Sequence, residues 1–148
     1  MIAPLNAEQV ARINAAARSW LGTPFMPNAA VKGAGVSCQK LVGTIYIEAG
    51  LLPPGMVIPD GDMAWGNAQT VSMVTRAVER SGRFAVVEKW APGDLTGFRF
   101  GGCVHHLGIV LNAEGEFIHV LRGHGVQLAS LLDAAFFSRL EKIWRPIT

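Results

Sequence analysis

The sequence is poor in charge and in cysteine, and it has no long hydrophobic run. Charged residues make up 16% of the 148 positions, and the net charge at pH 7 is only +2. The 13 lysines and arginines are scattered and form no basic face, which argues against a nucleic-acid partner. No apolar run approaches the roughly 18 residues that a membrane-spanning helix needs. Two cysteines are too few for a disulfide framework.

The amino end has no feature of a secretory signal, because residues 1–8 contain neither a basic head nor an apolar core. We therefore expect a chain that is made in the cytoplasm. Half of the residues are hydrophobic, which suits a globular domain with a core of its own. No repeat or change in composition marks a boundary, so we expect one domain over residues 1–148.

Helical spacing dominates the first half of the chain and short apolar runs the second. The expected first half has a helix opened by the capping box Asn6–Gln9 and ended by Gly22, a loop over 23–37, a helix from Cys38 to about Ala49, a connector over 51–61 and a helix over about 62–80. The expected second half has strands at 84–87, 95–100, 105–111, 117–121 and 142–146, a turn at Pro92–Asp94 and a short helix capped within Ser130–Asp133. This order predicts an α+β domain with helices packed on one antiparallel sheet.

Cys38 follows a glycine-rich stretch and stands at the start of a predicted helix. A thiol in the first helical turn feels the positive end of the helix dipole, which favours the thiolate. The backbone N–H of Cys38 has no partner within the helix and is a candidate donor to an oxyanion. The position therefore predicts a nucleophilic cysteine.

Two histidines are brought together if Asn112–Gly115 is the loop of a hairpin. Gly108 then pairs with His119, so that His106 and His119 become diagonal neighbours on one face while His105 points to the other. Gly108 would leave room on that face for a helix end, which would place Cys38 above it. His106 would then take the thiol proton and later protonate the leaving amine, while His119 would hold the tautomer of His106.

Five segments of the chain occur in the order that is typical of one family: Ala17–Phe25, Val31–Val42, Pro92–Leu95, His106–Val110 and Phe117–His119. From about Ala17 to Leu121 the chain resembles the NlpC/P60 cysteine peptidases, which have a papain-like fold. The loop Ala30–Gly35 is similar to the branch found in phage tails and gene transfer agents. The resemblance implies N-terminal helices on a central antiparallel sheet, and hydrolysis of peptide bonds in peptidoglycan stem peptides.

By the same resemblance, Cys38, His106 and His119 fall on the catalytic positions, and neither a cofactor nor a metal is expected. Candidates to line the substrate site are Phe25, Ser37, Gln39, His105 and Trp65. The chain departs from the family pattern at Ser37, Gln39, Lys40 and Phe25, where the family commonly has Asp, Ser, Gly and Tyr. The expected partners are a peptidoglycan peptide and proteins of a phage tail or prophage, with delivery to the cell wall by a phage-like particle.

Three other interpretations stay open at this point. The departures allow a structural or wall-binding component with a degenerate site. The same Cys–His chemistry also suits another acyl substrate, such as an ester, a lipid or an isopeptide. Cys38, Cys103, His106 and His119 together offer two thiols and two imidazoles, which suit zinc, although no Cys-x-x-Cys spacing is present. A Cys38–Cys103 disulfide is less favoured in a reducing cytoplasm.

Overall fold

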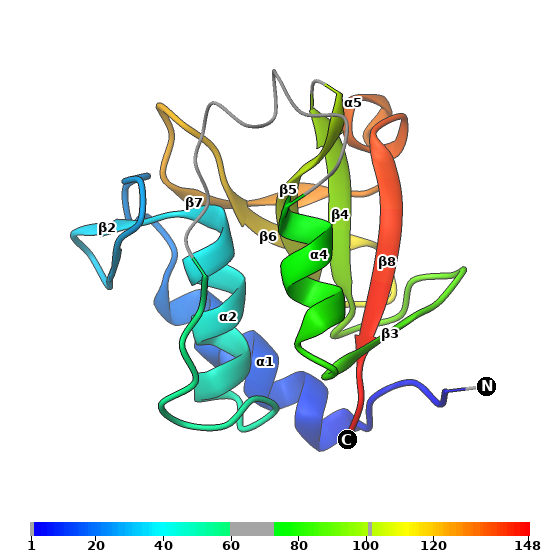
Figure 1. Ribbon diagram of the computed structural model, residues 1–148. Coiled ribbons are helices and arrows are strands. Elements are labelled where there is room, and N and C mark those ends of the chain that lie inside the picture. Colours follow the sequence, from blue (N-terminus) through cyan, green and yellow to red (C-terminus); the bar gives the residue numbers. More distant parts are fainter. Residues whose placement is uncertain (1, 60–72, 101) are drawn as a thin grey trace.

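The computed structural model describes residues 2–59, 73–100 and 102–148, and within them helices pack on a six-stranded antiparallel sheet (Figure 1). The strand order is β3-β8-β4-β5-β6-β7. The strands are β3 (Phe84–Val86), β4 (Leu95–Phe100), β5 (Cys103–Val110), β6 (Glu116–Val120), β7 (Val126–Ser130) and β8 (Leu140–Pro146). Helices α2 (Cys38–Glu48) and α4 (Met73–Arg80) lie against the middle of this sheet, and α1 (Ala7–Ser19) packs beside α2. The predicted α+β class is confirmed.

The helix starts follow the predicted caps. Asn6 and Gln9 exchange hydrogen bonds of 2.8 and 2.9 Å in a capping box before α1. Ser37 caps α2, which begins at Cys38 as expected. Helix α4 forms the end of the predicted third helix. The rest of that prediction, including Trp65, lies outside the described residues.

Two local predictions are wrong. Strand β7 was not expected, because its five residues follow a glycine-rich turn and show little alternation. The expected loop over 23–37 contains a small antiparallel pair, β1 (Ala30–Val31) and β2 (Gly35–Val36), whose strands are too short to leave a pattern. The short helix α5 (Ala134–Phe137) is capped within the predicted stretch, at Asp133, whose carboxylate accepts the N–H of Ala135.

Two groups of buried side chains form the core, one on each face of the sheet. The larger group joins α1, α2 and α4 to the sheet and includes Leu41, Ile45, Leu107, Ile109 and Trp144. The smaller group is built on Phe98, Val110, Phe117 and Leu131, with Phe136 of α5 packed against it. Because neighbouring residues of β5 alternate between the groups, the strand is buried on both faces.

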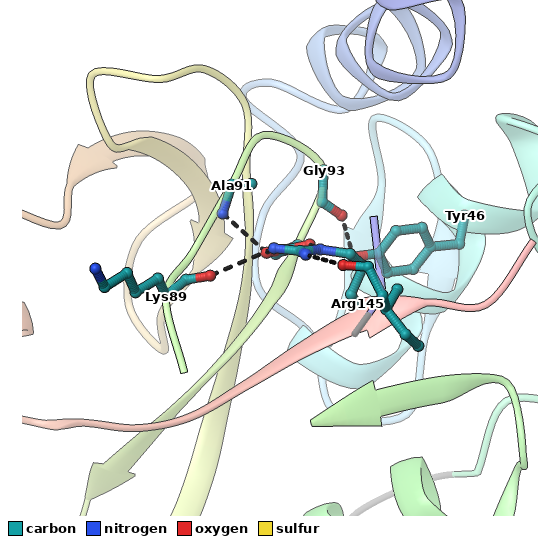
Figure 2. Close-up of polar contacts among 7 residues, drawn as sticks. Tyr46, Lys89, Ala91, Gly93 and Arg145 are labelled. Carbon is teal, nitrogen blue, oxygen red and sulfur yellow. Dashed lines mark hydrogen bonds and ion pairs between the residues drawn. The ribbon is translucent and has the colours of Figure 1, made fainter. Parts of the chain in front are cut away.

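A buried ion pair fixes the start of β4 (Figure 2). Asp94 is 0% exposed and Arg145 of β8 is 6% exposed, and the guanidinium donates to both carboxylate oxygens at 2.8 and 2.9 Å. Asp94 also accepts the N–H of Ala91 at 2.8 Å, which closes the predicted Pro92–Asp94 turn. The turn prediction is confirmed, whereas the partner of Asp94, 51 residues away, left no local signal in the sequence.

The same ion pair ties down segments from both ends of the chain. Arg145 donates further to the carbonyls of Ile2 and Lys89, at 2.9 and 3.3 Å. The hydroxyl of Tyr46 in α2 donates to the carbonyl of Gly93, next to Asp94, at 2.8 Å (Figure 2). Burial and the nearby Asp94 charge raise the pKa of Tyr46 well above its ordinary value, while the bond to Asp94 raises the pKa of Arg145. Tyr46 therefore stays a neutral donor and Arg145 stays charged.

We expect Arg145→Met to lower the free energy of unfolding by about 3–5 kcal/mol, because it leaves the Asp94 carboxylate buried without its cation. Urea denaturation at neutral pH measures the change. Arg12→Met is the matched control: Arg12 pairs with Glu8 at 3.8 Å on the exposed side of α1, and its loss should cost less than about 1 kcal/mol. Equal effects of the two substitutions would contradict the role given to the Asp94–Arg145 pair.

Candidate active site

Backbone hydrogen bonds place the start of α2 beside the turn that joins β6 to β7. The N–H of Met26 bonds to the carbonyl of Val36 at 3.1 Å, just before the helix cap. On the other side of the same segment, the N–H of Phe25 bonds to the carbonyl of His124 at 3.2 Å. The segment around Phe25 therefore connects the residues before Cys38 with the residues after His119.

The hairpin has the predicted register. Ile109 pairs with Ile118 and Val110 with Phe117, which is the alignment that sets Gly108 opposite His119. His106 Nε2 lies 3.0 Å from His119 Nδ1, so the two imidazoles are hydrogen-bonded across β5 and β6. The diagonal pairing predicted from the sequence is confirmed.

Cys38 lies where β5 and β6 separate. The N–H of Leu111 bonds to the carbonyl of Glu116 in β6 at 2.8 Å. Alternate N–H groups of a strand point to the same side, so the N–H of Leu107 also faces β6. The described pairs between the strands do not extend to Leu107. Next to Leu107, the Cys38 sulfur takes the place of a strand partner: it lies 4.0 Å from the carbonyl oxygen of His105 and close to the N–H of Leu107. The thiol thus contacts the backbone on both sides of His106.

In this conformation no hydrogen bond joins Cys38 Sγ to an imidazole among the described residues. The expectation that Cys38 sits above Gly108 is wrong, because a Cβ at Gly108 would lie 2.8 Å from the Phe117 ring, which fills that space. The thiol approaches from the edge of β5, and the histidine pair lies on the face that carries Phe117.

Aromatic rings enclose the histidine pair. The His106 ring lies 5.5 Å from the Phe100 ring and 5.8 Å from the Phe98 ring, between centroids. The His119 ring lies 4.9 Å from Phe117 and 5.1 Å from Phe136. His119 is 0% exposed and His106 only 5%. No residue of this cluster other than the histidines was singled out from the sequence, although the alternation of Phe98 and Phe100 in a strand was a usable signal.

Burial sets the charge of these groups. It lowers the pKa of His106 to about 3 and that of His119 to about 4, with smaller contributions from the neighbouring imidazoles. Burial also raises the pKa of the Cys38 thiol, and this effect exceeds the opposing one of the N–H groups of Leu107, Gln39 and Cys38 itself. The helix start favours the thiolate as predicted, but burial outweighs this effect and the net shift of the pKa is upward. At neutral pH the thiol and both imidazoles are uncharged.

The other predicted site residues have mixed surroundings. Phe25, Ser37, Gln39 and His105 are half-buried near the start of α2 or on β5, and Trp65 lies outside the described residues. Ser37 serves as the helix cap, with its Oγ 3.4 Å from the N–H of Lys40. His105 presents its carbonyl oxygen to the sulfur. The Lys40 ammonium donates to the carbonyl of Ile58 at 2.7 Å, so this departure from the family pattern fastens the connector after α2.

Cys38 is a free thiol. Among the residues whose side chains are described, no group of three or more His, Cys, Asp or Glu is placed to hold a metal ion. The side chain of Cys103, which completed the zinc interpretation, is not among them. No helix within the described ranges has both the length and the apolar character needed to cross a bilayer.

Comparison with solved structures identifies the fold. A lipoprotein-like protein of the NLP/P60 family from Staphylococcus aureus aligns with 99% of the chain, at a TM-score of 0.68 and 20% identity. The NlpC/p60 domain of the peptidoglycan hydrolase SagA aligns with 95% of it, at 0.62 and 20%, and an NlpC/P60 family protein from Bacillus cereus with 98%, at 0.66 and 20%. The chain therefore has the fold of NlpC/P60 domains, as the resemblance implied.

The lengths of these proteins differ from that of the chain. The chain spans 44% of the Staphylococcus aureus protein and 42% of the Bacillus cereus protein, but 99% of the SagA domain. It thus spans less than half of each of the two longer proteins. No family model and no curated protein matches the sequence.

We expect the histidine pair to make the fold sensitive to acid. Imidazoles of the unfolded chain take up protons below about pH 6.5, whereas His106 and His119 stay neutral in the folded state down to about pH 3 and 4. The contribution of the pair to the free energy of unfolding is therefore fully present above pH 6.5. It falls on acidification by up to about 1.4 kcal/mol per pH unit for each imidazole. Urea unfolding at pH 7.5 and pH 5 measures the loss, in a range where most carboxylates remain ionised.

His119→Gln should reduce this loss between pH 7.5 and pH 5, because one of the two buried imidazoles is gone. His124→Gln is the matched control, since His124 is exposed and contributes less to the pKa of His119 than burial does, and it should keep most of the loss. A parent protein that is equally stable at both pH values would contradict the neutral, buried state of the pair.

Cys38 should react as an ordinary or weakened thiol in the free protein. In a Cys103→Ser variant Cys38 is the only thiol, and the midpoint of its alkylation by iodoacetamide should lie above the value of about pH 8.5 for an unperturbed thiol. The same variant unfolded in urea supplies the control and should return the ordinary midpoint. A midpoint far below pH 8.5 in the folded protein would show a thiolate at rest.

Proposed function

We propose that this protein is a cysteine hydrolase that cleaves peptide bonds in the stem peptides of peptidoglycan. The observation that carries the proposal is that a thiol and two imidazoles lie on neighbouring segments, at the start of α2 and on β5 and β6. A thiol at a helix start lies against the backbone of His105 and Leu107, and the imidazole between them is hydrogen-bonded to a second, buried imidazole. A nucleophile, a base and a group that orients the base form the set that acyl transfer requires.

In the proposed reaction, the neutral His106 takes the thiol proton as the sulfur attacks the scissile carbonyl carbon. Proton transfer accompanies the attack, because neither group is charged at rest. The base nitrogen is His106 Nδ1, since Nε2 is engaged by His119. Hydrogen bonds of this kind are often open in the free enzyme and close when substrate binds, so the absence of a hydrogen bond between the sulfur and His106 is compatible with this step.

The later steps use the same groups. The backbone N–H of Cys38 stabilises the oxyanion of the tetrahedral intermediate, as a free donor in the first helical turn. His106 then gives its proton to the leaving amine, which leaves a thioester on Cys38. Water, deprotonated by His106, hydrolyses the thioester and restores the thiol.

The substrate class is supported by the SagA domain, a peptidoglycan hydrolase whose NlpC/p60 domain this chain matches over nearly its whole length. Membership of the phage-tail branch, with delivery by a phage-like particle, rests on the sequence resemblance alone and stays a prediction.

One observation favours a second function, that of a wall-binding component without hydrolysis. Burial raises the pKa of the Cys38 thiol, and a neutral thiol is a poor nucleophile unless a base acts on it directly. Under this interpretation the protein binds intact sacculi and releases no peptide at any pH between 5 and 9. Release of peptides from the same sacculi decides for the hydrolase.

We expect Cys38→Ala to lower the rate of muropeptide cleavage by on the order of 10⁴-fold or more, because no other group can form the covalent intermediate. Mass spectrometry of digested muropeptides gives the rate and the bond, and circular dichroism checks the fold. Cys103→Ser, which removes the only other thiol, should keep cleaving. The hydrolase assignment fails if the alanine variant cuts as fast as the parent, and preference for lipid esters in a substrate panel would overturn peptidoglycan as the substrate.

A further inference from the structure

The far side of the histidine pair holds a buried nitrogen without a hydrogen-bond partner. His119 Nδ1 is engaged by His106, whereas His119 Nε2 is buried and has no partner among the described residues. The rings of Phe117 and Phe136 lie 4.9 and 5.1 Å from the His119 ring, between centroids, and the Phe136 ring stands nearly perpendicular to it at 79°. An unpaired polar atom at such a place calls for an explanation.

We propose that Phe136 is a positioning residue for the histidine pair: its ring closes the aromatic enclosure around His119 and so holds the pair in the tautomer that leaves His106 Nδ1 free to accept a proton. The consequence for catalysis rests on the proposed function, whereas the tautomer itself is a property of the free protein.

The argument starts from the proton count of two neutral imidazoles. Each ring carries one N–H and one bare nitrogen, and the 3.0 Å bond between them needs one of each. In one arrangement His106 Nε2–H donates to His119 Nδ1, so that His119 carries its hydrogen on Nε2 and His106 Nδ1 is bare. In the other arrangement His119 Nδ1–H donates, so that His119 Nε2 is bare and His106 Nδ1 carries a hydrogen. Only the first arrangement leaves His106 a base.

The aromatic enclosure favours the first arrangement. The face of an aromatic ring is electron-rich, so it attracts an N–H group and repels a lone pair. A bare Nε2 on His119 would need a donor, and none of the described residues supplies one to this buried nitrogen. The hydrogen therefore resides on His119 Nε2, and the pair is polarised toward His106 Nδ1.

Phe136 is the member of this enclosure that comes from outside the two histidine strands and β4. It is the one half-buried side chain of α5, whose other residues are exposed. Its ring lies 5.0 Å from Phe117 and 5.6 Å from Phe98 as well as against His119. Without the ring, water gains access to His119 from the side of α5. Water both donates and accepts, so the two arrangements would become similar in energy.

The test is NMR of the protein with ¹⁵N-labelled histidine at pH 7.5, which distinguishes the tautomers of neutral imidazoles. In the parent, His106 and His119 should both carry hydrogen on Nε2. In Phe136→Leu, which keeps an apolar side chain but removes the ring, His106 should gain a measurable share of the Nδ1–H form. The kcat of the Phe136→Leu protein should fall about tenfold with KM unchanged, which is a part of the ~10²–10⁴-fold that a positioned base contributes.

Phe137→Leu is the matched control, because Phe137 is the next residue of the same helix and is 64% exposed. It should leave the tautomers and kcat as in the parent. A parent spectrum with hydrogen on His106 Nδ1, or a Phe136→Leu spectrum identical to that of the parent, overturns the inference; the parent spectrum alone decides if the variant does not fold. The expected spectra in a protein that cleaves no muropeptide would support the tautomer assignment and overturn the proposed function instead.

Discussion

The buried pairing of Asp94 with Arg145 is the interaction on which the rest of the structure depends. Taking both charges out of water is costly, and the cost is offset only because the guanidinium meets both carboxylate oxygens and two carbonyls besides. The bonds hold the start of β4 against β8 and against the amino-terminal segment. The backbone of Asp94 and Gly93 also bonds to Val110, at 2.9 and 2.7 Å, and this fixes the end of β5. Four residues before that end stands His106.

Exclusion of water dominates the chemistry of the site. The same desolvation that raises the pKa of the thiol lowers the pKa of both imidazoles, so all three groups are held in their neutral forms. If the proposed reaction takes place, a neutral base acts on a neutral nucleophile, as in a serine hydrolase, and no thiolate is formed beforehand. In the proposed reaction, the N–H groups near the sulfur would stabilise the negative charge that develops on it.

Two of the departures from the family pattern around Cys38, Ser37 and Lys40, have structural roles. Ser37 lacks the charge of an aspartate but still caps the helix. Lys40 bonds to the carbonyl of Ile58, and the side chain of Ile58 packs where a Cβ on Gly43 would stand, 2.5 Å away. The connector after α2 is thus fastened along the helix at two positions, one turn apart. These contacts account for the bulky Lys40 side chain at the helix start without assigning it to the substrate.

Local chemistry determined much of this protein. The capping box of α1, the Ser37 cap, the Pro92–Asp94 turn and the hairpin register each depend on residues close in sequence, where cap preferences and the two-residue period of a strand apply directly. The ordered motifs also predicted the NlpC/P60 fold. The register alone was enough to join His106 to His119, because a shift by one residue would have put them on opposite faces.

Only the tertiary structure decided the environment of these residues. Phe136 reaches His119, and Arg145 reaches Asp94, from segments that show no local sign of these contacts. The position of Cys38 at the edge of β5 depends on where β5 and β6 stop pairing. The net pKa of the thiol is likewise decided by the tertiary structure, because burial raises it by more than the N–H groups of the helix start lower it. The helix start acts through neighbouring N–H groups and was visible in the sequence, whereas desolvation is the sum of everything that packs around the sulfur.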